Sequence, residues 1–72
     1  MFHYALQFVD DEGKSFAQPI SVSDCVNVAA FFAELKGLVI ALPCKSKRAA
    51  LDIAVAWNES AKRDGGYRYA TP

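Results

Sequence analysis

Segment 44–48, Cys-Lys-Ser-Lys-Arg, concentrates the chemically suggestive residues of this 72-residue chain. Ser46 is a good N-cap, so Lys45, Lys47 and Arg48 fall at the N-terminus of the helix that follows. Cations there oppose the helix macrodipole and do not stabilise the helix. Free backbone amides beside cations are instead the chemistry of an anion site. The segment predicts contact with a nucleic acid, a nucleotide or an acidic protein surface; the alternative is a set of solvated side chains.

The two cysteines and the single histidine suggest less chemistry. Cys44 precedes cations that would stabilise a thiolate, but the sequence places no histidine base or resolving cysteine near it, so we expect a passive thiol. Cys25 falls on the apolar stripe of a predicted helix, where we expect it to be buried. His3 lies on the polar side of an alternating strand, as a surface or edge residue. These residues predict neither catalysis, nor a metal site, nor a cofactor.

A second group of aromatic and basic residues follows at 67–69, Tyr-Arg-Tyr, with Trp57 upstream. Such side chains stack on nucleic-acid bases when they line a positive groove, and they also anchor protein interfaces. Trp57 falls on the apolar stripe of a predicted helix. Arg68 and Tyr69 are therefore the candidates for contact with a partner.

The composition predicts one small globular domain over residues 1–72. Hydrophobic residues make up 53% of the chain and charged residues 22%, which argues against disorder. Eight basic and eight acidic residues cancel, so no bulk field attracts nucleic acid or an anionic membrane. Residues 1–36 nevertheless hold five acidic residues against two lysines, and residues 37–72 hold six basic against three acidic residues. This asymmetry hints at a charged partner.

The pattern at the N-terminus and the cysteine count indicate a reducing compartment. Two cysteines are too few for a disulfide scaffold, and the first residues alternate instead of forming an apolar leader. The longest uninterrupted apolar run, residues 28–33, is far shorter than the roughly 20 residues that span a bilayer. We expect a cytoplasmic protein without membrane contact.

Two alternating runs predict an N-terminal hairpin. Each reads as a strand with one face on a core. Residues 10–14, Asp-Asp-Glu-Gly-Lys, supply the turn between them. Pro19 lacks an N–H, which places the second strand at an edge or a bulge. The alternating residues are Phe2, Tyr4, Leu6 and Phe8, then Phe16, Gln18, Ile20 and Val22.

Residues 24–36 predict a first helix that is apolar almost all round. Ser23 is its expected N-cap, Asp24 suits the helix dipole, and Gly37 sits where a helix ends. Phe31 lies beside the narrow polar strip. Either both sides of this helix are covered within the domain, or part of it meets another chain, and a homodimer through helix 24–36 is one such arrangement.

The rest of the chain predicts a buried strand over 38–42, a helix over 47–62 and a short strand over 67–69. The order ββαβαβ indicates an α+β two-layer sandwich, with both helices on one face of a small mixed sheet. If residues 38–42 were a loop or extended a helix, the sheet would shrink to the hairpin plus the last strand. The core stripe of the second helix is Ala50, Ile53, Ala54, Trp57 and Ala61.

The expected function is that of a non-catalytic protein-binding module or inhibitor, which acts by steric occlusion of a partner surface. Small chains without motifs of this kind include phage and mobile-element proteins that block host complexes, such as anti-CRISPR proteins, and that setting is part of the hypothesis. The expected contact residues are Phe31, Lys45, Lys47, Arg48, Arg68 and Tyr69.

The alternative is a small nucleic-acid-binding domain that uses segment 45–48 together with the C-terminal basic residues, Lys62, Arg63 and Arg68. Its affinity would fall steeply with salt, whereas a protein interface tolerates moderate salt better. The sequence does not name the partner.

Overall fold

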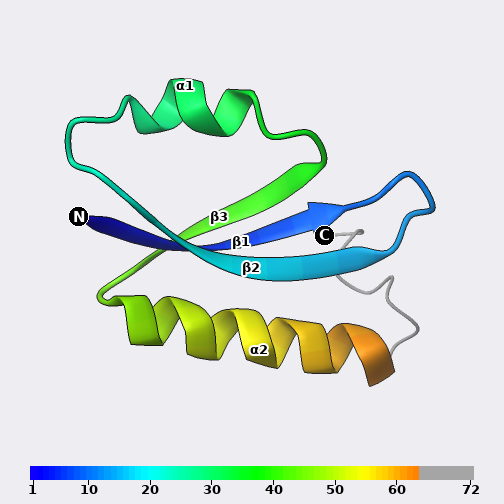
Figure 1. The fold of residues 1–72 in the computed structure, drawn as a ribbon. Coiled ribbons are helices and arrows are strands. Elements are labelled where there is room, and N and C mark those ends of the chain that lie inside the picture. Colours follow the sequence, from blue (N-terminus) through cyan, green and yellow to red (C-terminus); the bar gives the residue numbers. More distant parts are fainter. Residues whose placement is uncertain (64–72) are drawn as a thin grey trace.

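The computed structural model describes residues 1–63, which form a three-stranded antiparallel sheet and two helices (Figure 1). The strand order is β2-β1-β3, so β1 lies in the centre. The predicted α+β class is confirmed, and the described elements follow the order β-β-α-β-α. The predicted strand 67–69 lies outside the described residues. The elements are β1 (Phe2–Val9), β2 (Ser15–Val22), α1 (Val28–Ala33), β3 (Leu38–Cys44) and α2 (Lys47–Arg63).

The hairpin of β1 and β2 forms as its alternation predicts, with Phe2 opposite Val22 at one end and Val9 opposite Ser15 at the other. Asp10 organises the turn, because its Oδ1 accepts the backbone N–H groups of Glu12 and Lys14, both at 2.9 Å. Such side-chain bonds to the backbone two and four residues on are typical of aspartate in turns.

Both faces of strand β1 are covered, whereas its alternating sequence predicted that only one face would be covered. Ala5 and Gln7 on one face are 0% and 1% exposed, and Leu6 on the other is 2% exposed. The two edges of β1 pair with β2 and β3, and both pairings are antiparallel. The described sheet is therefore antiparallel throughout, and the prediction of a mixed sheet finds no support within residues 1–63.

Helix α1 is much shorter than the predicted helix 24–36. The predicted N-cap was wrong: the Ser23 hydroxyl accepts the N–H of Cys25, and its carbonyl accepts the N–H of Val26, so Ser23 begins a turn. Asn27 caps the helix instead, with its Oδ1 accepting the Ala30 N–H at 3.2 Å. Cys25 consequently lies outside the helix and is exposed, contrary to the prediction.

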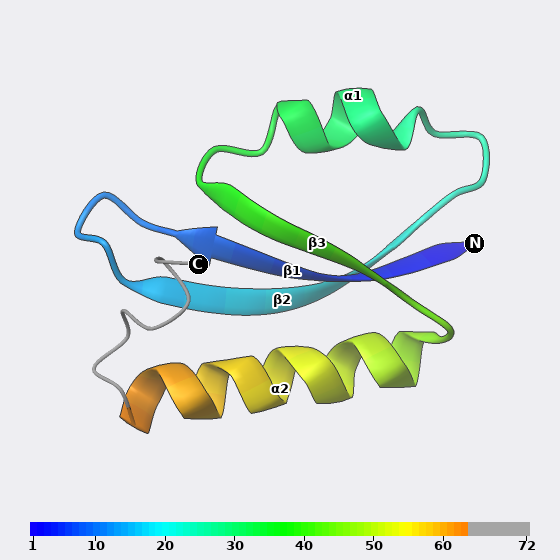
Figure 2. The same ribbon diagram turned by 180° about the vertical axis from the view of Figure 1, so that it is seen from behind.

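The two helices lie on opposite sides of the sheet (Figures 1 and 2), and the prediction that both pack on one face was wrong. On the α1 side, the ring of Tyr4 meets the ring of Phe32 edge to face at a centroid distance of 4.9 Å. Helix α2 packs mainly against β2 and β1 from the other side. The centre of β1 is therefore buried on both sides of the sheet, with Leu6 on the α1 side and Ala5 and Gln7 on the α2 side.

Helix α2 begins as predicted, because the Ser46 hydroxyl accepts the Ala49 N–H at 3.0 Å. Its sheet-facing stripe buries Ala50, Ala54 and Ala61 and half-buries Ile53 and Trp57, which confirms the predicted stripe. The predicted strand at 38–42 is also confirmed, and it extends to Cys44 as β3. Within residues 1–63, neither helix is long and apolar enough to cross a membrane.

Candidate functional site

Strand β3 carries three exposed apolar side chains. Ile40 and Leu42 lie opposite Gln7 and Ala5, so they share the face that α2 covers. Because α2 packs over β2 and β1 and touches β3 least, these two side chains remain 37% and 38% exposed. Val39, at the bulge where the register with β1 shifts, is 42% exposed. We call Val39, Ile40 and Leu42 the β3 strip.

The β3 strip leads directly into the basic segment, Lys45, Lys47 and Arg48, which is exposed throughout. Arg48 is engaged by Asp52 one helical turn on, at 3.0 Å between Nε and Oδ1. Lys45 and Lys47 differ: among the lysines of residues 1–63 they are the two that form no ion pair with a carboxylate of that region. This end of the sheet therefore presents uncompensated positive charge beside an apolar strip.

The outer edge of β3 presents backbone groups that no described strand pairs with. Pro43 lies opposite Tyr4 and has no N–H to donate, so the two residues form a non-hydrogen-bonded pair. The backbone carbonyl of Pro43 therefore points away from β1, toward the outer edge. Residues whose backbone groups point away from the neighbouring strand occur at every second position of an antiparallel strand. The backbone groups of Ala41 therefore also point away from β1. The edge thus displays the N–H and C=O of Ala41 and the C=O of Pro43.

The outer edge of β2 is occupied at Ala17 by contrast. The side chain of Asn58, from α2, bonds both the N–H and the C=O of Ala17 on that edge. Two residues on, Pro19 occupies the next outward position and has no donor. The prediction that Pro19 lies in an edge strand is confirmed.

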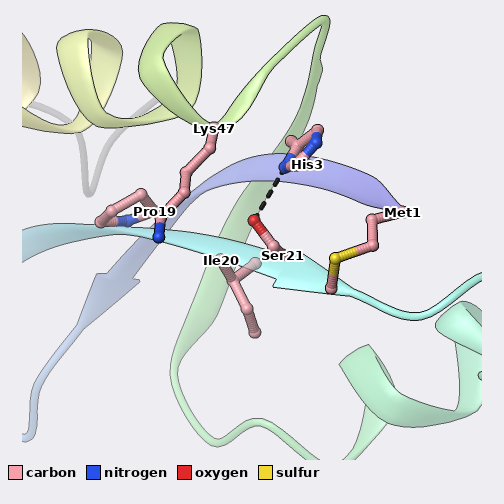
Figure 3. A pocket seen from close by; sticks show the side chains of 6 residues that line it. All are labelled: Met1, His3, Pro19, Ile20, Ser21 and Lys47. Atoms are coloured by element: carbon pink, nitrogen blue, oxygen red, sulfur yellow. Dashed lines mark hydrogen bonds between the residues drawn. The ribbon is translucent and has the colours of Figure 1, made fainter.

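A hollow of about 340 Å³ lies at the end of the sheet where α2 begins (Figure 3). Lys47 extends over β2 toward Pro19, and it brings the basic segment to the rim of the hollow. Inside it, His3 Nδ1 lies 2.7 Å from the hydroxyl oxygen of Ser21. The lining residues are Met1, His3, Pro19, Ile20, Ser21 and Lys47.

Strand pairing also brings together three residues that the sequence leaves scattered. Ser21 and Cys44 lie directly opposite His3 on its two sides, so serine, histidine and cysteine form a row across the sheet. The prediction that no histidine lies near Cys44 was therefore wrong, because only the register of β1 with β3 reveals the pair. The thiol points to the carbonyl oxygen of Leu42, at 3.4 Å, and not to the imidazole.

A Ser-His pair is the start of a nucleophilic site, but such a site also needs a group that orients the imidazole through its second nitrogen. No hydrogen bond between His3 Nε2 and another residue of 1–63 is present. The His3–Ser21 bond instead links two strands at the floor of the hollow, and no catalytic step follows from it.

The remaining predicted contact residues are dispersed. Phe31 lies in α1, half-buried, with its ring 5.7 Å from that of Phe32, and so on the other side of the sheet from α2. It does not share a surface with the basic segment. Arg68 and Tyr69 lie outside the described residues. The β3 strip was missed from the sequence, where a run of apolar residues reads as a buried strand.

Comparison with known proteins gave no match: no protein-family model fits the chain, and no curated protein or solved structure is significantly similar to it.

Proposed function

We propose that this protein is a non-catalytic module that binds another protein through the β3 strip and the adjoining basic segment. The observation that carries the proposal is the continuity of the two: exposed Ile40 and Leu42 lead within a few residues to Lys45 and Lys47, which form no ion pair with a carboxylate of residues 1–63. Apolar side chains supply the contact area of a protein interface, and charge at its rim steers encounter and selects the partner.

The partner that fits this surface is a protein with an apolar patch bordered by carboxylates. Binding would act by steric occlusion, because occupancy of a partner surface alone is enough to block it. That mechanism suits an inhibitor, such as one made by a phage or mobile element against a host complex, and it asks for no catalytic residue.

Nucleic acid is less well supported as the partner. Asp52 balances Arg48 at 3.0 Å, which leaves two cations in this segment, whereas phosphate-driven binding gains affinity with each phosphate that is neutralised. An apolar strip contributes nothing to phosphate contact. We therefore treat nucleic-acid binding as an outcome of the test.

Affinity capture of the tagged protein from extract of the cell that makes it, with and without nuclease, tests the proposal. The first variant is the double substitution Ile40→Ser with Leu42→Ser. Its matched control is Leu51→Ser with Val55→Ser, since these α2 side chains are also 43% and 50% exposed but lie on the flank of the helix where Asn58 bonds the outer edge of β2. We expect the unchanged protein to capture a partner protein whether or not nuclease is present. The first variant should fail to capture that partner, and the control should still capture it.

Charge is tested in the same way with Lys45→Glu and Lys47→Glu together, against Lys62→Glu and Arg63→Glu at the other end of α2. We expect the first pair to reduce capture about tenfold or more and the second to leave it nearly unchanged. Loss of all bound material on nuclease treatment would overturn the proposal in favour of nucleic acid. Equal capture by all four variants would show that this surface is not the interface.

A further inference from the structure

We propose that the outer edge of β3 takes up an extended segment of the partner protein as a fourth strand of the sheet. This inference rests on the proposed function and specifies how the partner docks. A strand added to a sheet edge gains affinity from backbone hydrogen bonds and specificity from alternate side chains. The occupant is an extended peptide segment with apolar residues at its centre and carboxylates near its ends.

The two edges of the sheet differ in a way that selects β3. Each edge carries one proline at an outward position, Pro19 on β2 and Pro43 on β3, but only on β2 does a side chain, the Asn58 amide, occupy both backbone groups of the neighbouring outward residue, Ala17, at 2.7 and 3.0 Å. A strand approaching β2 would have to displace that side chain. On β3, the outward N–H and C=O of Ala41 have no partner within residues 1–63.

The side chains that flank this edge fit an incoming strand. Ile40 and Leu42 project from β3 on the α2 side, and the distance of α2 from β3 leaves them partly uncovered. Strands in a sheet lie about 4.8 Å apart, so alternate side chains of an added strand would pack directly against these two. Apolar residues at those alternate positions would bury both.

Charge favours a foreign segment over a second copy of the chain. Lys45, at the end of β3, has no carboxylate partner among residues 1–63, and an acidic residue at the end of an added strand would supply one. In the acidic turn of a second copy, Asp10 Oδ1 accepts the backbone N–H groups of Glu12 and Lys14, and Asp11 and Glu12 already lie near Lys36 and Lys14. That turn therefore offers Lys45 less free carboxylate than an acidic segment of another protein would.

The probe for this test is a synthetic ten-residue peptide of alternating valine and threonine with two glutamates at each end, so that either strand direction meets a carboxylate at Lys45. Titration followed by amide chemical shifts measures its binding. We expect saturable binding with shift changes centred on Ala41. A peptide with lysines in place of the glutamates should bind about tenfold more weakly or not at all.

The decisive variant is Ala41→Pro, which removes the outward N–H and leaves the ladder with β1 intact, as Pro43 already does two residues on. Its matched control is Ala41→Ser, which keeps the N–H. We expect Ala41→Pro to abolish peptide binding and Ala41→Ser to retain it. If Ala41→Pro does not fold, two N-methylated versions of the peptide replace it, one methylated on the odd-numbered backbone nitrogens and the other on the even-numbered ones. At least one of the two peptides should fail to bind.

The outcomes separate this inference from the proposed function. Partner capture that is lost with Ile40→Ser and Leu42→Ser but retained with Ala41→Pro would overturn strand addition and leave the surface as an interface. Equal binding of the glutamate and lysine peptides would overturn the charge argument. A dimer of the chain alone in sedimentation analysis, converted to monomer by Ala41→Pro, would assign the edge to a second copy and overturn the foreign occupant.

Discussion

The side-chain amide of Asn58 makes two hydrogen bonds to the backbone of Ala17, a residue 41 positions earlier in the chain. Its Oδ1 accepts the Ala17 N–H at 2.7 Å, and its Nδ2 donates to the Ala17 carbonyl oxygen at 3.0 Å. One side chain thus does for the edge of β2 what a neighbouring strand would do, and it fastens α2 to the sheet at the same point.

Replacement of Asn58 by aspartate keeps its size but removes the donor and sets a carboxylate beside a carbonyl oxygen. We expect Asn58→Asp to lower the free energy of unfolding by about 1–3 kcal/mol, measured by urea denaturation, because a part-buried backbone group loses its partner. The neighbouring change Glu59→Gln removes only an exposed ion pair of 3.7 Å with Lys62 and should cost less than about 0.5 kcal/mol. Equal effects of the two changes would contradict this account.

Gln7 is 1% exposed on the central strand, and its Oε1 has no hydrogen-bond donor among the described residues. A buried acceptor without a partner costs free energy that an apolar side chain of similar shape does not. We expect Gln7→Met to raise the free energy of unfolding by about 1 kcal/mol. The same change at the exposed Gln18 should alter stability by less than about 0.5 kcal/mol, and a loss of stability in Gln7→Met would show that Oε1 is satisfied in solution.

Gly13 and Gly37 have nearly the same backbone angle, with φ of 82° and 81°, but different surroundings. A Cβ at Gly37 would lie 2.5 Å from the Val9 carbonyl oxygen, whereas one at Gly13 would meet nothing within 4 Å. Gly13→Ala should therefore cost about 1–2 kcal/mol from backbone strain alone. We expect Gly37→Ala to lower the thermal midpoint clearly further, and equal midpoints would rule out the close contact.

The two helices should respond differently to the loss of their N-caps. Ser46 caps α2, which buries alanines against the sheet, so Ser46→Ala should lower global stability by about 1 kcal/mol. Asn27 caps α1, which has no fully buried residue, so Asn27→Ala should mainly speed local amide exchange in α1. A global loss for Asn27→Ala as large as that for Ser46→Ala would show that α1 belongs to the cooperative core.

Periodicity was sufficient to predict the hairpin, β3 and α2, because each has one dominant pattern and clear ends. The first helix was predicted too long for the opposite reason. Its residues are apolar almost all round, so the pattern marks no boundary, and the prediction of its start rested on Ser23 alone as N-cap. In the structure Asn27 is the N-cap, because the Ser23 hydroxyl instead accepts the N–H of Cys25 in a turn.

Of the two parts of the candidate surface, the sequence predicted the basic segment and missed the β3 strip. Local composition identified the basic segment, but which of its cations has a partner depends on Asp52 lying one turn further along α2. The exposure of Ile40 and Leu42 depends on where α2 crosses the sheet, and the row of Ser21, His3 and Cys44 depends on strand register. Both properties come from long-range pairing, which no local pattern contains.

Five of the seven buried apolar residues in the described chain are alanines, at positions 5, 17, 50, 54 and 61. Alanine scanning, the usual way to map a core, therefore gives no information at most of the positions where α2 packs against the sheet, because these residues are already alanines. The informative change runs in the other direction: enlarging a residue such as Ala54 to leucine wedges the helix away from the strands. Tolerance to added volume, rather than to deleted volume, is what a mutational map of this protein would record.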